Sequence, residues 1–235
     1  MSKNILLMMM GGSGTRFGAD IPKQFVEVHG KPVFSYIVEK YSKLTCIDAI
    51  VIVCHESWIS YTEEWVEGLG VTCPWTVCAG GSSRSESVKN GLTAAAQWAG
   101  ADDVVLIHDA THPYVDDESM DAVIAATHAH GGATLGERQY DTVYGINPET
   151  GILEQVIPRE TVVSGASPEA FMFGLIHDIY ENTPMEQLEL YTSAGALALA
   201  NNIDMAVVGT NLINLKITYK HDMEVFKKLF HDYYF

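Results

Sequence analysis

Short apolar runs, many of them rich in β-branched residues, alternate along the chain with longer segments whose apolar residues recur at helical spacing. The first pattern predicts buried strands and the second predicts amphipathic helices. The predicted strands are Ile5–Met10, Ala49–Cys54, Thr76–Cys78, Val104–His108 and Met205–Val208. The predicted helices are Pro32–Lys43, Ser57–Leu69, Ser87–Trp98, Ser119–His130, Glu169–Glu181, Leu190–Asn201 and His221–Phe230. This alternation predicts an α/β fold, an open and mostly parallel sheet with helices on both faces.

One segment departs from the alternation. Two extended stretches, Thr142–Ile146 and Ile152–Ile157, flank the turn-forming sequence Asn147–Gly151. We therefore expect a β-arm at about residues 138–160, inserted into a single domain that spans residues 1–235. A two-stranded hairpin is marginally stable alone, so the arm needs a packing partner, for which a second subunit is one candidate.

Charge and apolar content narrow the class of partner. The 235 residues include 30 acidic and 14 basic side chains, a net charge of −16, which disfavours nucleic acid as a ligand. The apolar run Ile5–Met10 is too short for a secretory or membrane-spanning segment, so we expect a cytoplasmic protein without membrane association. The four cysteines contain no C-x-x-C pair and are expected to be buried, reduced thiols: Cys46, Cys54, Cys73 and Cys78.

Arginine is scarce in this acidic chain. Only Arg16, Arg84, Arg138 and Arg159 occur, and three of them follow a strand or an extended segment. In an open parallel sheet, ligands bind beyond the carboxyl ends of the strands. Cations gathered at that edge indicate a site for an anionic ligand.

The loop after the first predicted strand carries the strongest chemical signal. Met10–Gly18 is rich in glycine, whose backbone N–H groups can close around phosphate oxygens. Arg16 and Lys23 add positive charge suited to a polyphosphate. The loop lacks the Gly-Lys-Ser/Thr of a Walker motif, and its glycine spacing does not match the dinucleotide fingerprint G-x-G-x-x-G.

These residues resemble a known family, the 2-C-methyl-D-erythritol 4-phosphate and ribitol 5-phosphate cytidylyltransferases. The signature, a small-residue pair followed by G-x-G-x-R and then P-K-Q, corresponds to Gly11–Arg16 and Pro22–Gln24. Further segments resemble the family's later patterns in order, namely Gly80–Leu92, His108–Pro113, Asp141–Thr142 and Asn214–Thr218. Five ordered matches along one chain are far more specific than any single one.

The resemblance implies a Rossmann-like fold of the nucleotide-diphospho-sugar transferase type. It also implies an enzyme that transfers CMP from CTP to a sugar-alcohol phosphate, releasing pyrophosphate and a CDP-alditol. Such products feed isoprenoid precursors or surface polymers such as teichoic acid or capsule. Mg²⁺ is the implied cofactor, and the implied partner is a second copy of the chain, paired through the β-arm.

The resemblance assigns roles residue by residue. Arg16, Lys23 and Lys216 are the implied catalytic cations. The implied nucleotide-binding residues are Met10, Gly11, Gly12, Gly14, Gly81, Ser82, Ser87, Asp109 and Ala110. The implied acceptor-binding residues are Asp109, His112, Thr142, Arg159, Ser167 and Lys216. Asp109 is also the candidate Mg²⁺ ligand.

Three departures from the family pattern concern the acceptor. His112 stands where the family has an arginine, which predicts a charge that depends on pH. Ser167 and Glu169 replace the threonine and glutamine of T-P-Q-x-F, and Glu169 is expected in the first turn of a helix, facing solvent. Thr192–Gly195 replaces T-D-[DE]-A and so lacks both acidic residues. These departures leave the identity of the polyol phosphate open.

The sequence is also compatible with other classes of protein. A nucleotidyltransferase of the sugar-1-phosphate type would use another base, and a non-catalytic protein would bind CTP without releasing pyrophosphate. A nicotinamide-dependent dehydrogenase is disfavoured, because Cys54 and His55 stand where its acidic ribose ligand would end the second strand.

Overall fold

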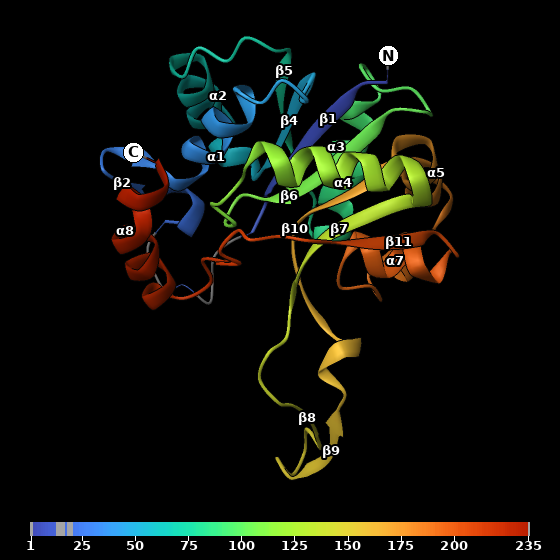
Figure 1. Ribbon diagram of the computed structural model, residues 1–235. Helices are drawn as coiled ribbons and strands as arrows, with labels where there is room; N and C mark the ends of the chain where they lie inside the picture. The colour runs from blue at the N-terminus through green and yellow to red at the C-terminus, as the bar shows by residue number, and fades with distance from the viewer. Residues whose placement is uncertain (1, 13–16, 18–20, 235) are drawn as a thin grey trace.

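A seven-stranded sheet forms the centre of the protein, with strand order β11-β7-β10-β6-β1-β4-β5 (Figure 1). The computed structural model describes residues 2–12, 17 and 21–234. The strands of this sheet are β1 (Asn4–Met10), β4 (Ala49–Cys54), β5 (Trp75–Ala79), β6 (Val104–Asp109), β7 (Gly131–Arg138), β10 (Val163–Met172) and β11 (Asp204–Gly209). All neighbours are parallel except β10, which is antiparallel to β6 and β7. The predicted fold class is confirmed.

Both faces of the sheet are covered by helices. Leu6 and Met8 of β1 belong to one buried cluster, and Ile5 and Leu7 to another, because successive side chains of a strand point to opposite faces. The first cluster is covered by α1 (Val33–Ser42), α2 (Ile59–Gly68) and α4 (Asp117–His130). The second is covered by α3 (Arg84–Ala95), α5 (Phe173–Asn182), α6 (Met185–Leu188) and α7 (Ala194–Ala200).

A third apolar cluster attaches the last helix, α8 (Lys220–Tyr234), to the ribbon formed by β2 (Glu27–Val28) and β3 (Lys31–Pro32). Two tyrosines of α8 also bond to the loop that follows β6. The Tyr233 hydroxyl donates to the carbonyl of Val115, and the Tyr234 hydroxyl donates to the carbonyl of Pro113. The helix thereby fixes the path of a loop that leaves the carboxyl edge of the sheet.

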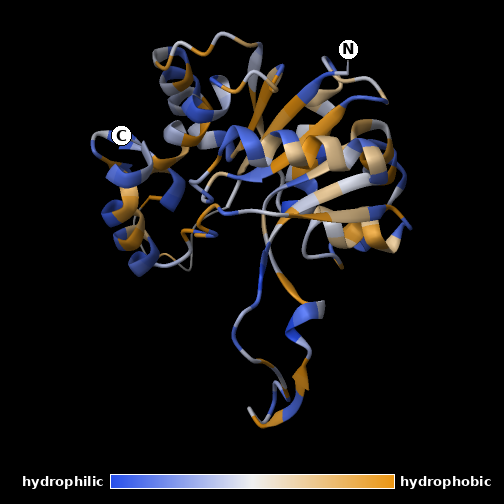
Figure 2. Cartoon of the chain, viewed as in Figure 1, coloured by the Kyte–Doolittle hydropathy of each residue, from blue (hydrophilic) through white to orange (hydrophobic). Residues whose placement is uncertain are grey.

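The predicted hairpin is confirmed as an arm that projects from the sheet (Figure 1). Its strands, β8 (Val143–Ile146) and β9 (Leu153–Ile157), pair antiparallel with each other. Hydrophobic residues occur along the arm (Figure 2), and several of them are exposed. Those more than half exposed are Tyr140, Tyr144, Ile146, Ile152, Leu153 and Val156.

Two strands of the central sheet and one helix start differ from the sequence prediction, which also lacked the short β2 and β3. β7 and β10 were absent from it, and the segment Glu169–Met172, predicted as helical, ends β10 instead. The helix begins only at Phe173. β10 carries Gly165 and Pro168 and changes register between Ala166 and Glu169, so its sequence has no regular alternation.

Other helices also begin or end at residues different from those predicted. The predicted helix Leu190–Asn201 is the shorter α7, and α3 begins at Arg84 because the Ser83 side chain caps it by accepting from the Glu86 N–H. Within the described residues, no helix combines the length and apolar character needed to cross a membrane. The four cysteines are free thiols, with Cys54 buried and the others half-buried.

Close packing of α3 on the sheet yields a stability prediction. A Cβ at Gly91 would lie 2.4 Å from Leu7 Cδ1 and 2.7 Å from Val53 Cγ2. We expect Gly91→Ala to lower the free energy of unfolding by about 1–3 kcal/mol, because neither neighbour has room to move. Urea denaturation would measure this loss. Gly68→Ala is the matched control, since a Cβ there meets nothing within 4 Å and should leave stability unchanged or slightly raised. Equal stability of both variants would contradict the packing argument.

Candidate active site

A cleft of about 750 Å³ opens at the carboxyl ends of β1, β5 and β6. Most of the predicted nucleotide and catalytic residues line it, namely Met10, Gly11, Gly12, Lys23, Gly81, Ser82, Ser87, Asp109 and Lys216. Ala110 is buried beside it and donates its N–H to the carbonyl of Met9. Gly14 and Arg16 lie outside the described residues. The predicted motifs therefore meet in one cleft, although Met10 and Lys216 are 206 positions apart in the sequence.

The buried side chain of Gln24 holds the start of the glycine-rich loop by hydrogen bonds. The Nε2 group of Gln24 donates to the carbonyl of Met10 at 2.7 Å and to the carbonyl of Gly12 at 3.0 Å. Both carbonyls then point toward Gln24, so Gln24 fixes the orientation of these peptides. Its neighbour Lys23 opens a 3₁₀ turn, Lys23–Phe25, and lines the cleft. The sequence prediction quoted Gln24 within a motif but gave it no role.

The opposite wall of the cleft is a tight turn built around Ser87. The Ser87 hydroxyl accepts from the N–H of Gly81 at 3.0 Å and donates to the carbonyl of Ser83 at 2.8 Å. A Cβ at Gly80 would lie only 2.8 Å from this hydroxyl oxygen, so the position requires glycine. The turn presents backbone groups to the cleft in a fixed geometry.

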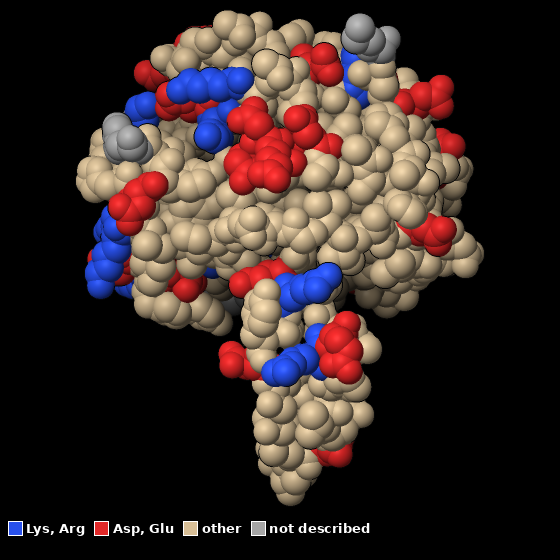
Figure 3. Space-filling model, viewed as in Figure 1, with Lys and Arg blue, Asp and Glu red and all other residues tan. Residues whose placement is uncertain are grey.

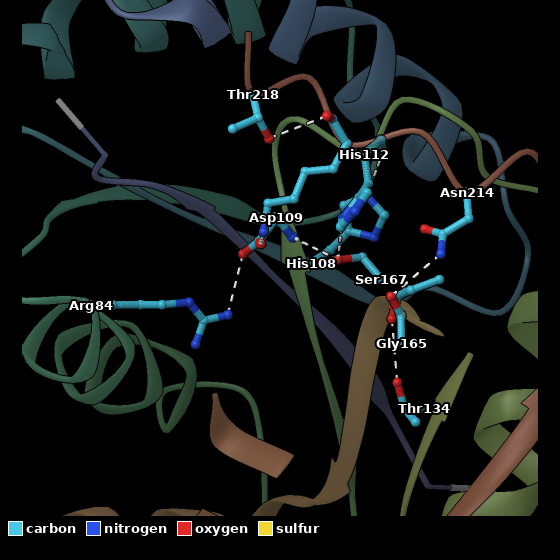
Figure 4. Close-up of polar contacts among 11 residues, drawn as sticks. Arg84, His108, Asp109, His112, Thr134, Gly165, Ser167, Asn214 and Thr218 are labelled. Carbon is cyan, nitrogen blue, oxygen red and sulfur yellow. Dashed lines mark hydrogen bonds and ion pairs between the residues drawn. The ribbon is translucent and has the colours of Figure 1, made fainter. Parts of the chain in front are cut away.

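Asp109 lies at the end of β6 between two cations (Figure 4). Lys216 Nζ bonds one carboxylate oxygen at 2.5 Å, and Arg84 Nη2 bonds the other at 3.2 Å. Burial alone would raise the pKa of Asp109, but the charges of Arg84 and Lys216 outweigh it and hold that pKa well below its usual range. Asp109 is therefore ionised at every physiological pH.

Arg84 was missing from the predicted site. Burial would lower the pKa of Arg84, but Asp109 and Glu169 more than offset this and raise it above the ordinary value. The signal was present in the sequence, because Arg84 is one of only four arginines and follows a strand. Lys216 reaches Asp109 because the segment before α8 is tied to the loop after β6 by the bond from Ile217 N to the carbonyl of Thr111, 2.9 Å.

His112 and Ser167 form a polar pair beside Asp109. Ser167 Oγ lies 2.6 Å from His112 Nδ1 and accepts from the Asp109 N–H at 3.4 Å. Ser167 Oγ and His112 Nδ1 share one hydrogen bond, whose direction follows the tautomer of the ring. Burial lowers the pKa of His112 to about 3, so its expected pH-dependent charge is wrong for the physiological range. His112 is a neutral hydrogen-bond donor where the family pattern has a permanent cation.

A second buried histidine supports this loop. His108 Nε2 donates to the carbonyl of His112 at 2.9 Å, and the Tyr41 hydroxyl lies 2.9 Å from His108 Nδ1. Since Nε2 carries the proton, Tyr41 donates to Nδ1. Burial lowers the pKa of His108 to about 4, so this ring is neutral as well.

Two predicted acceptor residues, Thr142 and Arg159, fall within the predicted arm, and the position of Glu169 differs from its prediction. Thr142 and Arg159 lie on or beside the arm, where Arg159 Nη1 donates to the carbonyl of Tyr140 at 2.6 Å. They do not meet the cleft of their own protomer. Glu169, expected on a solvent-facing helix, lies instead in β10 and accepts from the N–H of Gly195 at 3.1 Å. The cause is the extension of β10 through Met172.

The described residues do not build a metal site. No group of three His, Cys, Asp or Glu side chains among them is arranged to hold a metal ion. Both oxygens of Asp109, the candidate ligand, are bonded to cations. The predicted Mg²⁺ therefore has no set of protein ligands in this arrangement, and its participation stays a prediction.

An open parallel sheet whose carboxyl edge carries a glycine-lined cleft with Lys23, Arg84 and Lys216 defines a nucleotidyltransferase. The family model described as 2-C-methyl-D-erythritol 4-phosphate cytidylyltransferase matches residues 5–230. The chain belongs to this cytidylyltransferase family, as the resemblance predicts.

Similar proteins carry two names. A ribitol-5-phosphate cytidylyltransferase of Streptococcus agalactiae serotype Ia is 32% identical over 228 residues, covering 97% of this chain and 95% of that protein. A 2-C-methyl-D-erythritol 4-phosphate cytidylyltransferase of Geotalea uraniireducens is 33% identical over 218 residues, 92% of each chain. The crystal structure of 4-diphosphocytidyl-2C-methyl-D-erythritol synthase from Anaerococcus prevotii matches with a TM-score of 0.81 and 22% identity, covering 98% of this chain and 99% of that one. This last likeness concerns the fold.

The two neutral histidines predict a dependence of stability on pH. Below a pH of about 6.5 the unfolded chain protonates His108 and His112, whereas the folded chain does not. The unfolded state then binds more protons, so the free energy of unfolding decreases as the pH is lowered. The decrease is up to about 1.4 kcal/mol per pH unit for each histidine. Urea denaturation between about pH 7 and about pH 5 measures this slope. His112→Gln should make the slope shallower, and an unchanged slope would contradict the neutral state of His112.

Proposed function

We propose that the acceptor of this cytidylyltransferase is a sugar-alcohol phosphate such as ribitol 5-phosphate or 2-C-methyl-D-erythritol 4-phosphate. The observation that carries the proposal is the grouping of His112 and Ser167 beside Asp109 and Lys216, the last two of which line the cleft. Lys216 supplies positive charge for a phosphate, and the other three supply hydrogen-bonding groups for hydroxyls. Relatives of the two names are similarly identical to this chain, at 32% and 33%, so identity does not choose between the two acceptors. The product serves isoprenoid precursors or a surface polymer accordingly.

The reaction joins two anions, so electrostatics decides its rate. An oxygen of the acceptor phosphate attacks the α-phosphorus of CTP, and the bond from that phosphorus to the β-phosphate oxygen breaks to release pyrophosphate. The attacking phosphate is already ionised at neutral pH and needs no general base. Lys23 and Arg16 hold the triphosphate, and Lys216 neutralises charge on the α-phosphate and the incoming phosphate. Positioned cations of this kind lower the barrier by stabilising charge in the transition state.

Asp109 gives Lys216 a defined starting position. In the structure the ammonium group of Lys216 is neutralised by Asp109 at 2.5 Å rather than by a phosphate. Binding of the two phosphorylated substrates draws Lys216 toward them and leaves an Asp109 oxygen available to a hydroxyl of the ribose or the acceptor. The second cation, Arg84, keeps Asp109 from becoming an unpaired buried charge during this exchange.

The proposed enzyme acts as a homodimer through the arm. Thr142 and Arg159 of one protomer bind the acceptor phosphate in the cleft of the partner. The apolar side chains exposed on the arm support this, because a hairpin of this size needs a surface to cover it. On the face seen in Figure 3, charged groups gather near the base of the arm and its outer part is largely uncharged. Such a surface suits burial against a second copy.

The remaining substrates and surroundings follow from the same proposal. CTP enters with Mg²⁺ bound to its phosphates, since the described side chains offer that ion no site of their own. The protein works in the cytoplasm, where CTP is made, without nucleic acid or membrane as a partner.

Pyrophosphate release tests the proposal directly. We expect release with CTP and Mg²⁺ in the presence of ribitol 5-phosphate or methylerythritol 4-phosphate, and background release with ATP, GTP or UTP. Lys23→Ala should fold normally and turn over roughly 10²–10³ times more slowly, because a well-placed stabiliser of the transition state is lost. Circular dichroism checks the fold.

Lys227→Ala is the matched control, because Lys227 pairs with Glu224 on α8 and should be dispensable for turnover. A Lys23→Ala rate above about a tenth of the wild-type rate would contradict the assigned role. Tight CTP binding without release for any acceptor would favour the non-catalytic alternative, and release with another base would favour the sugar-1-phosphate type.

Sharing of the arm predicts complementation between two inactive subunits. In a mixed dimer of Lys23→Ala and Arg159→Ala chains, one cleft combines an intact Lys23 with the intact Arg159 of the other subunit. We expect such a mixed dimer to regain about one working site, measured by pyrophosphate release after co-expression and purification with two different tags. Activity no higher than that of either variant alone would contradict an arm that acts across the interface.

A further inference from the structure

Glu169 occupies an unexpected place next to the active site. It lies in β10 opposite Ile107 of β6, two residues before Asp109. Side chains at alternate positions of paired strands share a face of the sheet, so Glu169 and Asp109 lie on the same face as α3 and α7. The sequence thus places a second carboxylate beside Asp109, at the carboxyl end of β6.

One oxygen of this carboxylate is held firmly. Glu169 Oε1 accepts from the Gly195 N–H at 3.1 Å, and a Cβ at position 195 would lie 2.6 Å from that oxygen. The Glu169 carboxylate can therefore lie here only because residue 195 is glycine. The start of α7 has an independent cap, because the Ser193 side chain accepts from the N–H of Ala196 at 3.1 Å. Capping alone therefore does not account for a half-buried glutamate.

The other oxygen has a different environment. Across the part of the chain that the structure describes, Glu169 Oε2 makes no hydrogen bond or ion pair. After Asp109, Glu169 is the second anion whose charge raises the pKa of Arg84, so the guanidinium lies within electrostatic range of this carboxylate. The charged atoms of Arg84 and Glu169 form no ion pair within 4.0 Å. Arg84 instead forms its ion pair with Asp109 at 3.2 Å. The position between the guanidinium and the Glu169 carboxylate is therefore not bridged by a direct bond between them.

The chemistry of this position selects its occupant. A phosphate is repelled there by Glu169 and Asp109, and a cation is repelled by Arg84. A hydroxyl group suits both neighbours, because it can donate its proton to the carboxylate and accept from the guanidinium. A sugar alcohol carries several such hydroxyls.

We propose that Glu169 is a specificity-determining residue that binds a hydroxyl of the acceptor's carbon chain. Glu169 and Arg84 hold that hydroxyl near α7, while the acceptor phosphate lies toward Lys216. This arrangement fixes the direction in which the polyol enters the cleft. The inference rests on the proposed function, because it assumes a polyol phosphate as the acceptor.

A cycle that combines one substitution with one missing hydroxyl tests the proposal. Wild type and Glu169→Gln would be assayed for pyrophosphate release with ribitol 5-phosphate or methylerythritol 4-phosphate and with analogues that each lack one hydroxyl. We expect Glu169→Gln to lower kcat/KM for the full acceptor by about tenfold to a hundredfold, as for a lost hydrogen bond to a charged group. The KM for CTP should not change. One deoxy analogue should cost wild type the same factor and cost Glu169→Gln almost nothing more.

Two further variants separate recognition from structure. Glutamine keeps an oxygen for the Gly195 N–H, and Ser193→Ala is the matched control, because it weakens the start of α7 without touching the carboxylate. Ser193→Ala should discriminate among the analogues as wild type does. Gly195→Ala should behave like Glu169→Gln, because its Cβ displaces the carboxylate without removing the charge.

The outcomes distinguish this proposal from the one it rests on. If every deoxy analogue costs wild type and Glu169→Gln the same factor, Glu169 binds no hydroxyl and this inference is overturned, although the enzyme remains a polyol phosphate cytidylyltransferase. If wild type releases no pyrophosphate with any polyol phosphate, the proposed function itself is overturned, and the inference with it.

Discussion

The bonds from Arg84 and Lys216 to Asp109 are the contacts on which the arrangement of the site depends. They join the end of β6 to the start of α3 and to the segment before α8, at sequence separations of 25 and 107 residues. Without them a largely buried carboxylate would lose both of its cations, which is among the costliest changes a protein interior can undergo. The same bonds place two positive charges at the floor of a cleft in a chain whose net charge is −16. Local attraction for phosphate is compatible with the acidity of the whole chain because Lys23, Arg84 and Lys216 all line this cleft.

The antiparallel strand β10 is the second determinant of the site. It enters the sheet between β6 and β7, and its neighbours in sequence on the amino-terminal side form the arm. One continuous segment therefore supplies Arg159 at the arm, Ser167 beside His112, and Glu169 beside Arg84. A parallel strand in this place would begin at the far edge of the sheet and could not carry all three. The antiparallel strand β10 thus connects the acceptor side of the cleft to the exposed arm.

What the sequence could predict depended on burial and on local motifs. β1, β4 and β6 were recognised because strands buried on both faces are unbroken apolar runs. β7 and β10 were missed because Gly131, Gly132, Gly165 and Pro168 interrupt any such run. Lys23, Asp109 and Lys216 were recognised from short motifs. Gln24, Arg84 and Glu169 received no role there, because the contacts that define their roles are made with residues distant in the sequence. The charge state of His112 was wrong for the same reason, since only the folded chain buries it.

The tyrosines of α8 have a consequence for the order in which the protein loses its properties on warming. A final helical turn frays at lower temperature than a seven-stranded sheet, because fewer buried contacts hold it. When that turn of α8 opens, Tyr233 and Tyr234 release the carbonyls of Val115 and Pro113, and the loop that carries His112 loses its outer support. The geometry of the site would then change before the sheet itself unfolds. The last turn of α8 therefore couples the stability of a terminal helix to the geometry of the loop that carries His112.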